Sequence, residues 1–144
     1  MTLIHGTCVE LDGAAVLLRG PSGSGKSDLA LRLIEAGARL VADDQVTLQP
    51  RHGVLVAAAP AAIAGRMEVR GLGIVAVRYV AEARLVLVVD LVPPAAVERL
   101  PEPAEVVLAG VALPLLKLAP FEASAVAKLR LALREHGARL KAVG

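Results

Sequence analysis

The hydrophobic pattern consists of short apolar runs and longer amphipathic segments, separated by turn residues. The runs at 14–18, 38–42 and 83–91 are mostly apolar and rich in Val, Leu and Ala, which is typical of buried strands. The segments 26–36 and 122–136 instead repeat their apolar residues at helical spacing, and they predict two helices. Strands that alternate with helices indicate an α/β domain, in which a mixed sheet is flanked by helices.

Less regular segments lie between these elements. Residues 5–11 alternate weakly and predict an edge strand, and the turn Asp12-Gly13 joins it to the run at 14–18. The glycines within 66–75 follow charged residues and indicate a mobile loop. Additional short strands are expected at residues 46–48, 53–57, 106–108 and 111–113. The pattern contains no internal repeat and no linker between domains.

Composition assigns the chain to the globular class. A length of 144 residues suits one domain spanning residues 1–144, and 56% hydrophobic against 21% charged residues disfavours disorder. Asp90 and Pro93 interrupt the longest apolar stretch, so no membrane span is expected. The N-terminus lacks the regions of a signal peptide, and the single cysteine, Cys8, excludes an internal disulfide. These features predict a cytoplasmic protein.

The charge balance gives little support to nucleic-acid binding. Sixteen Lys and Arg residues oppose fourteen Asp and Glu residues, which leaves a net charge of +2. The aromatic residues are only Tyr79 and Phe121. Base stacking along a nucleic acid requires more aromatic surface than this. We therefore expect no nucleic-acid partner.

One motif carries specific chemistry, and we name residues 20–27 the glycine loop. It matches the phosphate-binding pattern G-x-x-x-x-G-K-[ST] and lies between a predicted strand and a predicted helix. Glycines allow backbone N–H groups to surround phosphate oxygens, and the helix N-terminus adds partial positive charge. Lys26 would contact the β- and γ-phosphates, and the Ser27 hydroxyl would ligate Mg²⁺. The predicted nucleotide-binding residues are Gly20, Pro21, Ser22, Gly23, Ser24, Gly25, Lys26 and Ser27. The alternative is a glycine turn before an ordinary helix, which the two correct flanks disfavour.

A carboxylate is expected near such a loop, where it holds Mg²⁺ or orients the nucleophile. Two predicted strands offer one: the first ends at Asp90, and the second ends at Asp43 and Asp44. Adjacent residues of a strand point to opposite faces, so one acid of the pair can ligate metal while the other accepts a proton. The pattern favours Asp43 and Asp44 over Asp90 as the acidic partner of the glycine loop. The alternative for both places is an acid that lies in solvent at the end of a strand.

Several segments together resemble the C-terminal catalytic domain of the HPr kinase/phosphorylase family. They are His5-Gly6, the glycine loop followed by the acid Asp28, residues 40–44 (LVADD) and residues 68–74 (EVRGLGI). The likeness is strong over residues 3–80 and weaker from 81 to about 122. The glycine loop is common to many families, whereas LVADD and EVRGLG are far more specific.

The resemblance implies a P-loop kinase-like domain that uses ATP and Mg²⁺ to phosphorylate a serine of HPr, the phosphocarrier of the sugar phosphotransferase system. It also implies the reverse phosphorolysis and a homo-oligomer, typically a hexamer. Long members of the family carry an N-terminal domain, and here the motifs begin near Met1, so the chain resembles a truncated form. Long members also have a Pro-Gly-Arg-Asn segment where residues 119–124 contain no arginine, so kinase activity is implied more directly than phosphorolysis.

The same resemblance assigns roles to individual residues. Asp43 would be the base that accepts the seryl proton, and Asp90 receives no catalytic role. The other implied residues are Lys26 and His5 beside the phosphates, Asp28 at the nucleotide, Ser27, Asp44 and Glu68 at Mg²⁺, and Arg70, Gly71, Leu72 and Gly73 at the partner. Without the family, His5 would be an ordinary surface histidine, and Glu68 and Arg70 a solvated strand face.

Two alternatives to a protein kinase remain open at this stage. A small-molecule kinase would use the same loop, but the chain has no long, arginine-rich segment suited to a lid. A regulatory module that senses nucleotide without transfer would keep residues 20–27 but would not need Asp43 and Asp44.

Overall fold

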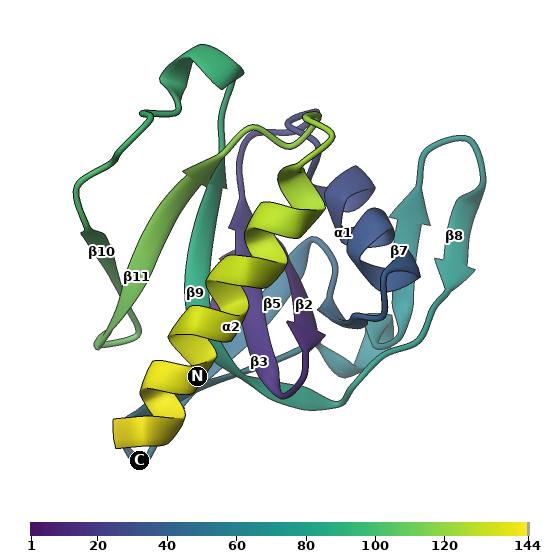
Figure 1. Cartoon of the computed structure of the whole chain (residues 1–144). Coiled ribbons are helices and arrows are strands. Elements are labelled where there is room, and N and C mark those ends of the chain that lie inside the picture. The colour runs from purple at the N-terminus through teal and green to yellow at the C-terminus, as the bar shows by residue number, and fades with distance from the viewer. Residues whose placement is uncertain (144) are drawn as a thin grey trace.

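The computed structural model describes residues 1–143, and side chains are described as far as residue 136. Within this range the chain forms a large mixed sheet, a separate β-hairpin and two α-helices (Figure 1). The strands are β1 (Thr2–His5), β2 (Thr7–Leu11), β3 (Ala14–Arg19), β4 (Arg39–Ala42), β5 (Gln45–Arg51), β6 (Val54–Ala58), β7 (Arg66–Val69), β8 (Gly73–Ala76), β9 (Glu82–Leu91), β10 (Ala104–Leu108) and β11 (Val111–Leu118). The helices are α1 (Lys26–Glu35) and α2 (Ala125–Val143).

The order of strands in the large sheet is β1-β5-β6-β9-β3-β2-β4. β9 is central, because it pairs in parallel with β3 on one side. On its other side it pairs with β6 near its start and with β11 near its end. β3, β9 and β11 are therefore parallel to one another, and their carboxyl ends lie at one edge of the curled sheet (Figure 1).

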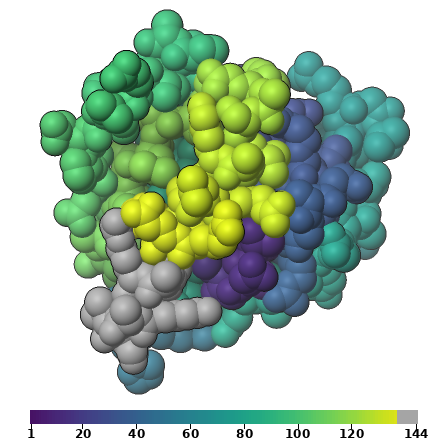
Figure 2. Space-filling view, viewed as in Figure 1, coloured from purple at the N-terminus to yellow at the C-terminus, as the bar shows by residue number. Residues whose placement is uncertain are grey.

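Two hydrophobic cores hold this sheet. In the first, Leu29 and Leu33 of α1 and Leu129 of α2 pack against the face formed by β3 and β9. Figure 2 shows α2 lying across the centre of this side, with α1 next to it. In the second core, strands pack on strands: Leu17 and Leu48 belong to one buried cluster that contains no helical residue. The expected mixed sheet is therefore present, but both helices cover one face, since the curled sheet buries its other face against itself.

The structure confirms the main predicted elements and corrects three others. β3, β4, β9 and α1 lie where the apolar pattern placed them, and Gly37, whose φ is 112°, follows the C-cap residue of α1. Thr7–Leu11 is an interior strand, not an edge strand, because β4 pairs with its outer side. The segment 66–75 is the hairpin β7–β8 instead of a mobile loop. The second helix runs as far as Val143, beyond the predicted end at 136.

No helix in the described part of the chain is both long and apolar enough to cross a membrane.

Cys8 is expected to be chemically silent in the folded protein. Its side chain is completely buried in β2, and this burial raises the pKa of the thiol, so little thiolate forms. We predict that an aromatic disulfide reagent modifies no thiol in the native chain at mildly alkaline pH and one thiol after denaturation. The chain has one cysteine, so the signal needs no correction for other thiols. Rapid modification of the native protein would show that β2 opens readily.

Candidate functional site

The glycine loop connects the end of β3 to the start of α1, and its backbone requires glycine at specific positions. Gly23 and Gly25 have φ values of 82° and 102°, in the left-handed region that side chains with a Cβ disfavour. A Cβ on Gly20 would lie 2.5 Å from Ser24 Oγ and 2.9 Å from Ser24 Cβ, so any other residue there would require Ser24 to shift. The loop therefore presents bare backbone at the N-terminus of α1.

Lys26 places its ammonium group inside this loop. The residue is only 9% exposed, and its Nζ donates hydrogen bonds to the carbonyl oxygens of Gly20 at 2.6 Å and Pro21 at 3.1 Å. Ser24 Oγ is buried and, among the described residues, has no hydrogen-bond partner. A buried cation, an unpartnered hydroxyl and helix N-terminal amides fit a phosphate group. We name this arrangement the anion cradle, and phosphate binding by it stays a prediction.

Asp43 is the acid that the structure brings to this loop. It follows β4 and is 9% exposed. Its Oδ1 accepts hydrogen bonds from Thr7 Oγ1 at 3.1 Å and Ser27 Oγ at 3.5 Å. Its Oδ2 accepts one from the backbone N–H of Glu68 at 3.1 Å. Strand β2, helix α1 and strand β7 therefore converge on one carboxylate, which lies directly beside the hydroxyl that follows the loop lysine.

Thr7 is a site residue that the sequence analysis missed. Its hydroxyl is buried and orients Asp43, but a threonine at the start of a strand gives no signal of that kind in the sequence. The adjacent His5-Gly6 pair was the only clue to this segment, since it belongs to the resemblance described above.

Asp44 and His5 form a second, exposed pair. His5 Nδ1 lies 3.3 Å from Asp44 Oδ1, and the two side chains are 61% and 71% exposed. The backbone N–H of Gly6 donates to the carbonyl oxygen of Asp44, whose φ of 71° turns the chain here. The two acids thus differ in exposure, with Asp43 buried and Asp44 facing solvent beside His5, and their division of roles stays a prediction.

Of the predicted magnesium ligands, Ser27 and Glu68 each make a hydrogen bond to Asp43, and Asp44 follows Asp43 in the chain. The Ser27 hydroxyl donates its hydrogen bond to the Asp43 carboxylate, and the Asp44 carboxylate pairs with His5. Glu68 reaches Asp43 only through its backbone N–H, and its side chain is exposed. Within the described residues, no group of three His, Cys, Asp or Glu side chains could hold a metal ion by itself. Mg²⁺ in phosphoryl-transfer sites usually has few protein ligands and takes others from phosphate and water, so this donor set fits it.

Asp90, the competing acid, is neutralised by Arg19. Arg19 Nε donates to Asp90 Oδ1 at 2.8 Å and its Nη2 donates to Oδ2 at 3.1 Å, and the two residues face each other across β3 and β9. A carboxylate held by a bidentate arginine is less available as a ligand for a metal ion. The geometry therefore favours Asp43 over Asp90 as the acid that acts beside the glycine loop.

We predict that Asp90→Asn reduces stability without affecting phosphoryl transfer. The Asn side chain removes the charge that pairs with Arg19, and both side chains are 31% exposed, so the expected cost is about 1 kcal/mol. Urea denaturation measures this cost, and a transfer assay measures the second part. A loss of transfer in a folded Asp90→Asn protein would return this acid to the candidate site.

The remaining predicted residues lie at the rim. Asp28 is exposed and pairs with Arg32 one turn along α1, at 3.0 Å. The predicted partner-binding residues form the turn of the hairpin β7–β8, which projects from the side of the molecule (Figure 1). Gly71 and Gly73 have positive φ, and Leu72 is 75% exposed. These partner-binding residues are Arg70, Gly71, Leu72 and Gly73.

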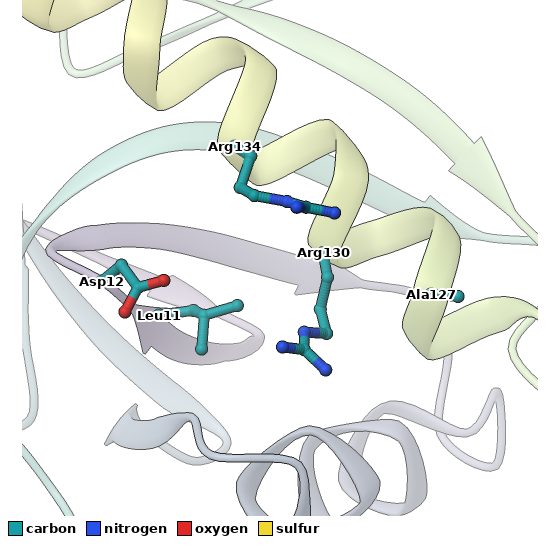
Figure 3. A pocket seen from close by; sticks show the side chains of 5 residues that line it. All are labelled: Leu11, Asp12, Ala127, Arg130 and Arg134. Carbon is teal, nitrogen blue, oxygen red and sulfur yellow. The ribbon is translucent and has the colours of Figure 1, made fainter.

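A separate hollow of about 370 Å³ lies away from this site. It is lined by Arg130 and Arg134 of α2 and by Leu11 and Asp12 near the β2–β3 turn (Figure 3). This turn is at the opposite end of β3 from the glycine loop. Both arginines are exposed and a carboxylate lines the same hollow, so we assign no ligand to it.

Comparison with known sequences identifies relatives of this arrangement. The sequence model of the HPr Serine kinase C-terminal domain family matches residues 1–117. An HPr kinase/phosphorylase from Clostridium tetani is 47% identical over 74 residues, and one from a Geobacillus species is 51% identical over 75 residues. Each of these alignments covers 51% of this chain and 24% of the relative. The matched segment is thus about a quarter of the length of these relatives.

Comparison with solved structures extends the similarity to the whole chain. The structure of the Hpr(Ser) kinase/phosphatase from Coxiella burnetii matches with a TM-score of 0.85 and 25% sequence identity, and the match covers 100% of both chains. It therefore includes the region beyond residue 117, where α2 lies. Together, the family match and the shared fold show that this chain belongs to the HPr serine kinase C-terminal domain family.

Proposed function

We propose that this chain is an ATP- and Mg²⁺-dependent protein-serine kinase that phosphorylates HPr, the phosphocarrier of the sugar phosphotransferase system. The observation that carries the proposal is the position of Asp43, a buried carboxylate in contact with Ser27 at the end of the glycine loop. Membership of the family supports HPr as the acceptor. The proposal extends to a cytoplasmic location and to a homo-oligomer, for which the family's hexamer is the expected form.

The glycine loop would bind the phosphates of ATP. Its backbone N–H groups and the N-terminus of α1 supply partial positive charge, and Lys26 supplies a full charge within the same cradle. Because Lys26 is held by two loop carbonyls, its ammonium is already oriented before a ligand binds. Such preorganised charge stabilises phosphoryl transfer more than solvent does.

Asp43 would act as the general base toward the seryl hydroxyl of the acceptor. Hydrogen bonds from Thr7 and from the backbone of Glu68 fix the orientation of its carboxylate. A base acts when it lies within hydrogen-bond reach of the proton that it accepts, and here the base is fixed beside the phosphate cradle. The same carboxylate would return the proton in the reverse direction.

Mg²⁺, when bound, would neutralise charge on the phosphate oxygens. Ser27 would contribute its hydroxyl oxygen, and Asp44 and Glu68 would contribute carboxylates from the rim. His5 would orient Asp44 through the contact that the two side chains already make.

Reverse phosphorolysis is the second part of the proposal, with less support than kinase activity. Inorganic phosphate would have to bind as the attacking group, and an arginine is the usual residue for that task. The segment 119–124 beside the glycine loop contains Pro120 and Phe121 but no arginine.

Transfer of label from γ-labelled ATP to purified HPr tests the proposal. We expect a Mg²⁺-dependent phosphoserine on HPr, and no label on HPr whose acceptor serine is replaced by alanine. ATP binding without transfer to HPr would contradict the kinase assignment. It would favour a nucleotide-sensing module, or a kinase for a small molecule if label appeared on another acceptor.

A further inference from the structure

The ring of Phe121 lies against the glycine loop. A Cβ on Gly25 would be 2.8 Å from Phe121 Cζ and 3.2 Å from its Cε1, so the outer edge of the ring contacts this glycine. The side chain is nevertheless 70% exposed. Because only the edge of the ring contacts the loop and most of the side chain is exposed to solvent, the aromatic face is available to a ligand beside the loop.

The position of Phe121 in the fold is one where ligands of α/β proteins bind. The residue lies between β11 and α2, and β11 is parallel to β9, which is parallel to β3. The segment after β11 and the glycine loop after β3 therefore leave the sheet at the same edge, and Figure 1 shows them near each other. Open sheets bind ligands at the carboxyl ends of such strands.

Helix α1 holds this segment in place. Arg32 donates a hydrogen bond through Nη2 to the carbonyl oxygen of Pro120, and a second through Nε to Asp28 Oδ2 at 3.0 Å. Asp28 and Arg32 belong to the helix that the glycine loop begins. The distance between Phe121 and the anion cradle is thus set by the same helix. The only other aromatic residue in the sequence is Tyr79.

We propose that Phe121 stacks against the base of the nucleotide whose phosphates the glycine loop holds. This inference rests on the proposed function, and it makes Phe121 a specificity residue for nucleotides over simple polyphosphates. Stacking on an aromatic ring accepts any base, because every base has a π face. The ring therefore selects for the presence of a base and discriminates weakly between adenine and guanine.

Calorimetric titration of wild-type and Phe121→Ala protein with ATP and with inorganic tripolyphosphate tests the proposal. We expect Phe121→Ala to weaken ATP binding about tenfold and to leave tripolyphosphate binding unchanged. Leu131→Ala is the matched control, since Leu131 is a 61% exposed apolar residue of α2 and should alter neither affinity. Phe121→Trp should retain the affinity for ATP. Because the chain has no tryptophan of its own, its fluorescence should respond to ATP but not to tripolyphosphate.

Two results would overturn the assignment of Phe121 while leaving the proposed function intact. One is unchanged ATP affinity in Phe121→Ala, and the other is equal weakening of both ligands, which would show that the ring shapes the loop. A wild-type chain that bound neither ATP nor tripolyphosphate would instead overturn the proposed function, and the role of Phe121 with it.

Discussion

Asp43→Asn is expected to abolish phosphoryl transfer to HPr while leaving ATP affinity nearly unchanged. Asparagine has the same shape, and its one acceptor oxygen can still accept the hydrogen bond from the backbone N–H of Glu68. Its amide NH2 would then face the Thr7 hydroxyl, which can accept a hydrogen bond, so the local fold should persist. It cannot take the seryl proton, and loss of a general base costs about 100-fold or more in rate. Steady-state transfer to HPr and calorimetry with ATP measure the two effects separately.

Asp90→Asn is the matched control for this variant. Asp43 directly follows β4 and Asp90 lies in the last two residues of β9, but Asp90 is paired with Arg19, whereas Asp43 contacts Ser27. We therefore expect phosphoryl transfer to HPr to be lost in Asp43→Asn and retained in Asp90→Asn. Wild-type rates in Asp43→Asn would remove the proposed base, and a large loss of ATP affinity would assign Asp43 to nucleotide binding instead.

Lys26→Ala is expected to weaken both ATP binding and transfer, unlike Asp43→Asn. The substitution removes the buried ammonium and leaves the carbonyl oxygens of Gly20 and Pro21 without its hydrogen bonds. A charged hydrogen-bonding group of this kind is worth a factor of about 10 to 100 in affinity, and more in the transition state. Calorimetry with ATP and the HPr transfer assay are again the measurements.

Lys128→Ala provides the comparison for charge removal alone. Lys128 is an exposed residue of α2 that pairs with Glu122, so its loss changes the net charge equally without touching the loop. If Lys26→Ala bound ATP as tightly as Lys128→Ala, the anion cradle would not be the nucleotide site.

The glycine loop could be predicted from the sequence because its information is local. Eight consecutive residues define the motif, and the strand and helix beside it follow from apolar periodicity. The structure confirms β3, the turn and α1 at those positions. Binding of phosphate by the loop stays a prediction.

The environment of Asp43 could not be predicted in the same way. Its partners Thr7 and Glu68 are separated from it by 36 and 25 residues, and only the pairing of β2 with β4 and the position of β7 bring them together. The pair Arg19–Asp90 also depends on register, in this case between β3 and β9. Such contacts depend on tertiary structure that periodicity does not encode.

The errors in the predicted fold have a similar origin. The weak alternation of residues 5–11 predicted an edge strand, yet the polar Glu10 within it is buried and ion-paired with Arg39 of the neighbouring strand β4. Glycines in 66–75 suggested mobility, whereas Gly71 and Gly73 supply the positive φ values of a hairpin turn. In both cases the prediction considered one segment alone, whereas the structure of that segment depends on its pairing with another strand.

Mass spectrometry of HPr after incubation with the chain, ATP and Mg²⁺ is the most direct test of the central claim, with Asp43→Asn in parallel. The account predicts one phosphoserine on HPr with the wild-type chain, and unmodified HPr with an Asp43→Asn chain that still binds ATP. Unmodified HPr with a wild-type chain that binds ATP would contradict it, as would equal phosphorylation by both chains.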